Sequence, residues 1–299
     1  MPEKARWISS AVVLGGNGAM GSLFCTQLAR DIDHVTAIDS DTASPLRTDN
    51  VVSLYADACN LSGEAKAALA DADLVIMALP EHVASSALGG ITSSLRPKAL
   101  LVDTLSVKTH IVKAIGDIRP SGESLSINPM FAPSLGFAGQ STAVIILDRG
   151  PLASRFLELM ESWGCQLVFL TAEEHDRMTA MLQTITHAAI LTFGMALHKL
   201  DYDLVAVEPL MPPPHRTMLA LVARILNADP EVYWDIQSSN PFAAGARAAL
   251  EDGVRELCQV VDRENRADFR HIVDTLHSLF GEESLQIFQE YCGRMFQLR

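Results

Sequence analysis

A short apolar run that leads directly into closely spaced glycines constrains this chain more than any other feature. Residues 11–21 read AVVLGGNGAMG, with glycines at positions 16, 18 and 21. In a dinucleotide-binding strand–turn–helix unit, the first such glycine allows the turn and the second lets backbone approach a pyrophosphate. The third lets the helix pack close to the strand. We therefore expect a pyrophosphate at the N-terminus of the next helix, held by Gly16, Asn17, Gly18, Ala19, Met20 and Gly21.

A carboxylate follows the second apolar run of the chain. Residues 34–38 form this run, and Asp39 ends it. An acidic side chain about 20 residues after the glycines is placed to bind the ribose diol of the cofactor. Asp39 would repel the 2′-phosphate of NADP, and no arginine follows it before Arg47. The sequence therefore predicts NAD as cofactor.

Length, composition and charge limit the class of protein. The 299 residues are enough for two domains, and 48% hydrophobic with 20% charged residues is typical of a soluble globular protein. The net charge of −13 argues against nucleic acid or an anionic membrane as partner. The 5 cysteines are scattered without metal-ligand spacing, which favours a reducing cytosol and no metal site. The first ten residues lack the apolar core of a signal peptide, so we expect a cytoplasmic protein.

Strand-like runs alternate with helical ones up to about residue 170. This alternation predicts an α/β fold, with a Rossmann-type, doubly wound, mostly parallel sheet in residues 1–170 and an all-α helical domain in residues 171–299. Ligands bind beyond the carboxyl ends of such strands. Further cofactor contacts are therefore expected directly after the fourth apolar run, at Leu79, Pro80 and His82.

One helix, expected over residues 173–199, is unusually apolar. Residues 179–197 contain no Asp, Glu, Lys or Arg, which is long enough to suggest a membrane span. Gln183, His187 and several threonines interrupt the segment, and no second one follows. We expect it to lie within a helical domain or between two subunits, and we favour a dimer interface.

Several further motifs identify a family. They are ALPEHV at 78–83, DTLSVK at 103–108, INPMFAP at 127–133, EEHD at 173–176 with His187 after it, and an arginine pair. With the glycine turn, they resemble the prephenate dehydrogenase family, most closely the dehydrogenase part of the bacterial chorismate mutase–prephenate dehydrogenase type. The β-hydroxyacid dehydrogenases fit less well, because their catalytic lysine is missing from the start of the long helix.

This resemblance implies an NAD-dependent oxidative decarboxylation of a cyclohexadiene dicarboxylate by a homodimer joined through its helical domains. Hydride leaves ring carbon C4 for the nicotinamide, and the C1 carboxylate leaves as carbon dioxide. Ser106 and Lys108 match a family motif beside nicotinamide and substrate, and His187 matches a histidine near the substrate. Arg224 matches an arginine that binds a substrate carboxylate, and Arg216 matches a second one. The two arginines are eight residues apart, about 12 Å along a helix, so they need not bind the same carboxylate.

The chain departs from the family at Asn128. The family carries a histidine there, which takes the proton of the C4 hydroxyl as hydride leaves. An amide cannot accept that proton, and general-base catalysis is worth ~10²–10⁴ in rate.

Three hypotheses fit this departure. The first is an amine at C4, as in 4-amino-4-deoxyprephenate, whose lone pair can expel hydride without a strong base. The product would be 4-aminophenylpyruvate, a precursor of the p-aminophenylalanine of some antibiotics. The second is a prephenate or arogenate dehydrogenase of tyrosine synthesis that uses His187 or a water as base. The third is an inactive NAD-binding regulatory protein.

Overall fold

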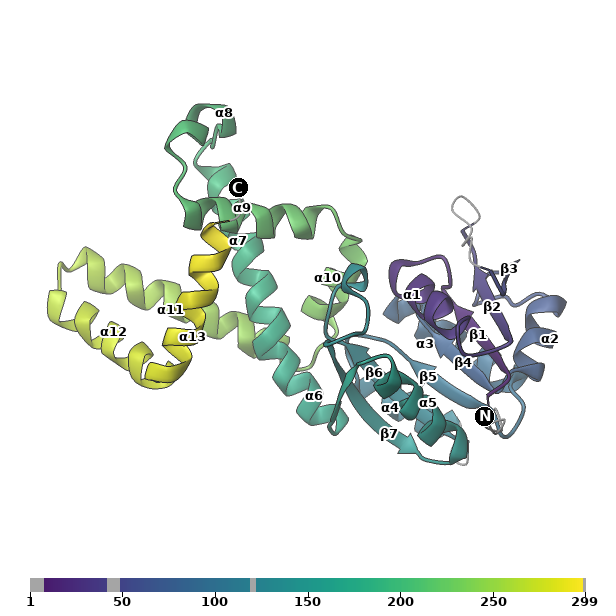
Figure 1. Cartoon of the computed structure of the whole chain (residues 1–299). Coiled ribbons are helices and arrows are strands. Elements are labelled where there is room, and N and C mark those ends of the chain that lie inside the picture. The colour runs from purple at the N-terminus through teal and green to yellow at the C-terminus, as the bar shows by residue number, and fades with distance from the viewer. Residues whose placement is uncertain (1–7, 42–48, 119–121, 298–299) are drawn as a thin grey trace. The chain divides into compact units, whose positions relative to one another are not determined.

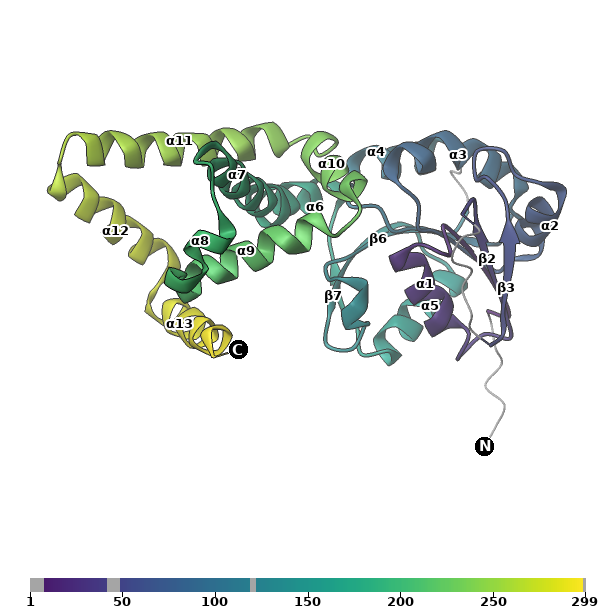
Figure 2. The same cartoon turned by 90° about the horizontal axis from the view of Figure 1, so that it is seen from above.

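The chain contains two compact units. The computed structural model describes residues 8–41, 49–118 and 122–297, so Arg47 and the first seven residues of the N-terminal segment lie outside the described residues. The units are Met1–Met178 and Thr179–Arg299, and their division falls a few residues after the boundary expected at 170. Figures 1 and 2 show a sheet with helices in the first unit and helices alone in the second.

The first unit is built on one eight-stranded sheet with the order β3-β2-β1-β4-β5-β6-β7-β8. All neighbouring strands are parallel except β6 and β7, which confirms the mostly parallel, doubly wound sheet. The strands are β1 (Ser10–Leu14), β2 (His34–Asp39), β3 (Val51–Tyr55), β4 (Leu74–Met77), β5 (Leu100–Asp103), β6 (Ser124–Pro129), β7 (Ser141–Asp148) and β8 (Gln166–Phe169). The strand order reverses between β1 and β4, which is where such sheets bind ligands.

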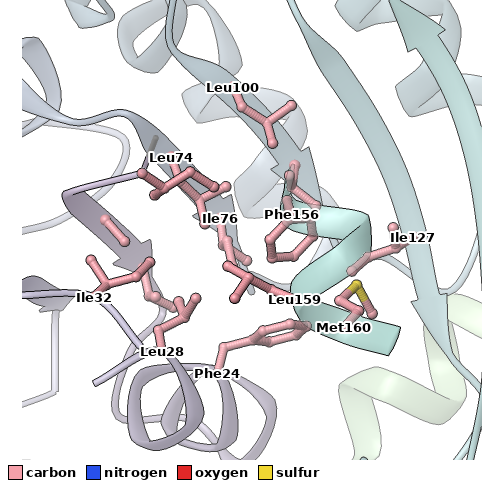
Figure 3. Packing of buried hydrophobic residues seen from close by; sticks show 14 of the residues in the cluster. Phe24, Leu28, Ile32, Leu74, Ile76, Leu100, Ile127, Phe156, Leu159 and Met160 are labelled. Atoms are coloured by element: carbon pink, nitrogen blue, oxygen red, sulfur yellow. The ribbon is translucent and has the colours of Figure 1, made fainter. Parts of the chain in front are cut away.

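Helices cover both faces of the sheet. Residues of α1 (Ala19–Leu28) and α5 (Pro151–Ser162) belong to one buried cluster, and residues of α2 (Gly63–Asp71), α3 (Glu81–Ser94) and α4 (Thr109–Ile118) belong to the other. Figure 3 shows Phe24 of α1 and Phe156 of α5 packed with Ile76 of β4. The two rings lie 6.5 Å apart between centroids, in a tilted arrangement. These contacts anchor α1, and with it the glycine turn, to the sheet.

The second unit begins within one long helical stretch. This stretch consists of α6 (Ala172–Thr179), a π-helical segment (Ala180–Thr184) and α7 (Ile185–Lys199), in agreement with the single helix expected from the sequence. Short helix α8 (Leu204–Val207) and α9 (Pro213–Leu226) follow, then α10 (Pro230–Ser238), α11 (Ala243–Asp262), α12 (Arg266–Phe280) and α13 (Glu282–Phe296). Asp229 and Asn265 cap α10 and α12 by accepting hydrogen bonds from backbone N–H groups.

Apolar side chains of the helical unit are widely exposed. Helices α12 and α13 bury no residue of their own, and their exposed side chains include Phe269, Val273, Leu276, Leu279, Phe280, Ile287, Phe288 and Tyr291. Among the described residues, one helix (Ala172–Lys199) is long and apolar enough to cross a membrane by length and composition alone, and only 22% of its apolar window is buried. A single chain therefore leaves much of this unit's apolar surface uncovered.

Candidate functional site

The glycine turn joins β1 to α1, and three of its positions require glycine for different structural reasons. Gly15 has a φ of 76°, so it is Gly15 and not Gly16 that makes the turn possible. A Cβ on Gly16 would lie 2.6 Å from the Cβ of Ala37 on β2, and one on Gly21 would lie 2.0 Å from the Gly15 oxygen. The expected role of Gly16 in the turn is therefore wrong, because its lack of a side chain serves close packing on β2.

The start of α1 is exposed. Gly18 precedes the helix without a side-chain cap and is exposed, and a Cβ placed on it would make a tight contact of 3.3 Å with the Gly15 oxygen. Asp39 ends the neighbouring strand β2, and its carboxylate accepts hydrogen bonds from the N–H groups of Asn17 (2.9 Å) and Asp41 (2.9 Å). An open helix N-terminus beside a carboxylate at the end of β2 fits the pyrophosphate and the ribose of a dinucleotide.

Other residues expected around the cofactor lie nearby in the fold. Pro80 and His82 are exposed at the start of α3, and Leu79 is half-buried against the core. All three follow β4, the strand next to β1. The structure thus places them at the point where the strand order reverses.

Lys108 is completely buried. Its ammonium Nζ lies 2.7 Å from Oδ1 of Asp103 and donates to the carbonyl of Ile127 at 2.6 Å. Burial lowers the pKa of Lys108, and the charge of Asp103 opposes this effect. Both hydrogen bonds join β5 and β6 to the loop before α4. The side chain predicted to bind substrate is therefore engaged inside the protein, where it bonds the carbonyl of the residue before Asn128.

Asn128 lies near the carboxyl end of β6 and contacts a histidine that follows β8. Its Nδ2 donates to Nε2 of His175 (3.0 Å), and Nδ1 of His175 lies 2.8 Å from Oδ1 of Asp176. Burial lowers the pKa of His175, although Asp176 opposes the shift, so this imidazole is neutral near pH 7. The three side chains form a buried, hydrogen-bonded chain.

The register of the last three strands brings His175 to Asn128. Ile127 of β6 pairs with Val144 of β7, and Val144 pairs with Phe169, the last residue of β8. Helix α6 therefore begins level with the end of β6. The sequence shows the motif EEHD at 173–176, but nothing in it assigns a role to His175 or Asp176.

Asp176 also holds the start of α4. It accepts hydrogen bonds from the backbone N–H groups of Lys108 (2.8 Å) and Thr109 (2.8 Å), and from the Thr109 hydroxyl. Burial alone would raise the pKa of Asp176, but the hydrogen bonds from His175, Thr109 and Lys108 bring it below its usual value. The carboxylate thus stays ionised and fixed at a helix N-terminus. Ser106, two residues before Lys108, is half-buried and its hydroxyl has no partner among the described residues.

The second unit contains the remaining predicted residues. His187 on α7 packs edge-on against Tyr233, with 4.8 Å between ring centroids, and its Nδ1 is buried without a hydrogen-bond partner in the described part of the chain. Burial, and then the positive charge of Arg224, lower the pKa of His187. Arg224 and Arg216 are both exposed on α9, and within the described ranges neither forms an ion pair. Arg224 therefore has a free guanidinium close enough to affect His187.

Comparisons with known proteins agree with these observations. The model of the prephenate dehydrogenase nucleotide-binding domain matches residues 35–145, and that of the prephenate dehydrogenase dimerization domain matches residues 171–275. A 4-amino-4-deoxyprephenate dehydrogenase from Streptomyces pristinaespiralis is 41% identical over 285 residues, 95% of both chains. A T-protein from Enterobacter agglomerans is 30% identical over 93% of this chain and 69% of its own length.

A solved structure has the same fold. Prephenate dehydrogenase from A. aeolicus, in complex with hydroxyphenyl propionate and NAD+, superposes with a TM-score of 0.72 at 16% identity, covering 90% of this chain and 96% of the other. At that identity the likeness concerns the fold. Together with the relative that is 41% identical over nearly the whole chain, these matches confirm the resemblance, and this chain belongs to the prephenate dehydrogenase family.

Proposed function

We propose that this protein catalyses the NAD-dependent oxidative decarboxylation of 4-amino-4-deoxyprephenate to 4-aminophenylpyruvate, in the supply of p-aminophenylalanine for antibiotic synthesis. The observation that carries the proposal is Asn128, at the carboxyl end of β6 where the family has a basic histidine. The similarity to a 4-amino-4-deoxyprephenate dehydrogenase supports it.

An amine at C4 makes a strong base unnecessary. When hydride leaves C4, the nitrogen lone pair forms a C4–N double bond. The electron pair of the bond from C1 to the carboxylate then enters the ring as carbon dioxide leaves, which makes the ring aromatic and returns the lone pair to nitrogen. The nitrogen loses no proton in these steps, provided that it starts as a neutral amine. A hydroxyl oxygen donates its lone pair less readily and benefits from a base.

Asn128 has an acceptor for such an amine. Its Nδ2 is bonded to His175, and its Oδ1 accepts no hydrogen bond from the described residues. An N–H of the substrate amine can donate to this oxygen while the nitrogen lone pair stays free for the reaction. NAD, when bound, would supply the hydride acceptor. We propose that Gly18, with the start of α1, holds its pyrophosphate, that Asp39 holds its ribose, and that Ser106 lies beside its nicotinamide.

Asp39 is proposed to set the choice of cofactor. Asp39→Ser should weaken NAD binding and narrow the preference for NAD over NADP, because the carboxylate no longer binds the ribose diol or repels a 2′-phosphate. Asp39→Asn is the comparison variant: it keeps an oxygen for the Asn17 N–H but loses the charge and the acceptor for the Asp41 N–H. Titration of each variant with both dinucleotides measures the effect. An unchanged preference in Asp39→Ser would remove Asp39 from the ribose site.

Arg224 is proposed to bind a substrate carboxylate, since a guanidinium matches a carboxylate with two parallel hydrogen bonds. Arg224→Ala should raise KM for substrate at least tenfold with little change in NAD affinity, because a charged hydrogen bond contributes about 1.5–3 kcal/mol. Arg216→Ala, on the same helix, is the comparison variant and should have the smaller effect. Steady-state kinetics at saturating NAD measures both, and a normal KM for Arg224→Ala would exclude it from the site.

We also propose a homodimer that forms through the helical unit, in a reducing cytoplasm. The exposed apolar side chains of α12 and α13 support the dimer, since monomeric proteins seldom expose so large an apolar surface. The family model for this unit is described as a dimerization domain. The five cysteines are all free, as expected in a reducing compartment.

A side-by-side assay tests the proposed function. NADH formation is followed with 4-amino-4-deoxyprephenate, prephenate and arogenate at equal concentrations. The amino compound should give the highest kcat/KM. Faster turnover of prephenate or arogenate would instead favour tyrosine synthesis with His187 as base, a role that its unpartnered Nδ1 allows. No turnover of any substrate would favour a regulatory protein.

A further inference from the structure

The two ends of the Asn128 side chain have opposite hydrogen-bonding properties. The carbonyl oxygen accepts, whereas the NH2 group only donates. An oxygen directed at the substrate amine would bind one of its N–H groups. An NH2 group directed there would donate to the nitrogen lone pair, which must be free to expel hydride. The direction of this amide therefore matters for the reaction.

His175 determines that direction through its own protonation. A carboxylate only accepts hydrogen bonds, so the nitrogen of His175 that faces Asp176, Nδ1, carries the proton. In a neutral imidazole the other nitrogen, Nε2, is then an acceptor. Asn128 lies 3.0 Å from this nitrogen and has to present its NH2 group to it. The carbonyl oxygen of Asn128 consequently points away from His175.

Asp176 cannot act as a donor toward His175, so it cannot move the proton from Nδ1 to Nε2. Its Oδ1 accepts from the Lys108 N–H and its Oδ2 from the Thr109 N–H, each at 2.8 Å. Backbone donors are fixed in place, so the carboxylate stays an acceptor toward His175. Hydrogen bonds donated from Asn128 to His175, and from His175 to Asp176, therefore run in one direction inside a buried network.

We propose that His175, held by Asp176, is a positioning residue that keeps the carbonyl end of Asn128 toward the C4 substituent and so favours an amine at that carbon. This inference rests on the proposed function. His175 itself acts only through Asn128, and its loss should lower kcat on the amino substrate more than it raises KM.

Two substitutions at one position separate positioning from packing. His175→Gln can place an amide oxygen close to the Nε2 position, where it accepts from Asn128. His175→Leu fills a similar volume without an acceptor, so the Asn128 amide is free to turn. We expect kcat on 4-amino-4-deoxyprephenate to fall at least tenfold in the Leu variant and less than about threefold in the Gln variant, a difference of roughly 0.7 kcal/mol or more at the barrier. Both variants should bind NAD like the wild type, which also serves as the check on folding. Equal losses in the two variants, or wild-type kcat in a folded Leu variant, would overturn the proposal.

A second measurement needs no turnover. Nitrogen-15 NMR of protein labelled at histidine reports which ring nitrogen carries the proton, and His175→Leu identifies the signal of His175. The proposal expects the proton on Nδ1. A proton on Nε2 would direct the Asn128 oxygen toward His175 and overturn the proposal. If the wild type fails to turn over the amino compound while the proton lies on Nδ1, the proposed function is wrong and the orientation of Asn128 still holds.

Discussion

Asn128→His should raise kcat on prephenate by up to ~10²-fold, since a well-placed general base contributes about that much or more. The surroundings favour a productive imidazole. Nε2 of His175 accepts a hydrogen bond from residue 128, so a new imidazole would direct its N–H toward His175. Its other nitrogen would then be unprotonated and available to the C4 hydroxyl.

The same variant should lose activity on the amino compound or stay level with the wild type. An imidazole adds no needed group there, and a protonated one would disfavour the positive charge that develops on the nitrogen at C4. Kinetics on both substrates with one preparation measures the change in preference. The idea fails if the histidine variant gains nothing on prephenate while it remains folded and binds NAD. It also fails if the wild type already uses prephenate as fast as the amino compound, in which case His187→Ala is the next variant to assay.

Lys108→Met should destabilise the first unit by about 3–5 kcal/mol, because it leaves the buried carboxylate of Asp103 without its counter-charge. Both side chains are completely buried, and the ammonium also bonds the Ile127 carbonyl. The double variant Asp103→Leu with Lys108→Met removes both charges and should recover part of the loss. Lys113→Met is the matched control, since Lys113 is exposed on α4.

Urea unfolding at one fixed protein concentration measures these differences. All variants carry Trp234→Phe, so that the remaining tryptophans lie in the first unit. Their fluorescence, including that of the buried Trp163, then reports on the unit that contains Lys108. If Lys108→Met unfolds at the urea concentration of the Lys113→Met control, the buried pair does not stabilise the unit. A stable Lys108→Met variant with raised KM would return Lys108 to the role of substrate ligand.

Local patterns in the sequence were enough to predict the sheet, the long helix and the glycine turn. Strands, helices and glycine turns depend mainly on residues that are close together in the sequence, so their patterns can be recognised there. The assignment of the turn to Gly16 failed because Gly15 and Gly16 are adjacent glycines. The positive φ of Gly15 and the packing of Gly16 against Ala37 on β2 separate their roles. The antiparallel direction of β7 also has no local signature.

The buried contacts of the site could not be predicted from local sequence patterns. The segment that contains Lys108 looks like an exposed polar end of a strand, and nothing in it reveals that Asp103 and the Ile127 carbonyl will enclose the ammonium. His175 lies 47 residues from Asn128. Their contact depends on the register of three strands, β6, β7 and β8, and on the short length of β8. A contact between residues so far apart in the sequence is visible only in the folded sheet.

Asp176 has two structural roles, and this has an evolutionary consequence. This carboxylate secures the first turn of α4 and also fixes the proton on His175, so a mutation there would harm folding before it could alter substrate preference. The side chain at position 128 is less constrained, because His175 can accept a hydrogen bond from an amide or from an imidazole. Codons for asparagine and histidine differ by a single base. A lineage could therefore pass between hydroxyl and amino substrates in one mutational step, with the supporting pair already in place.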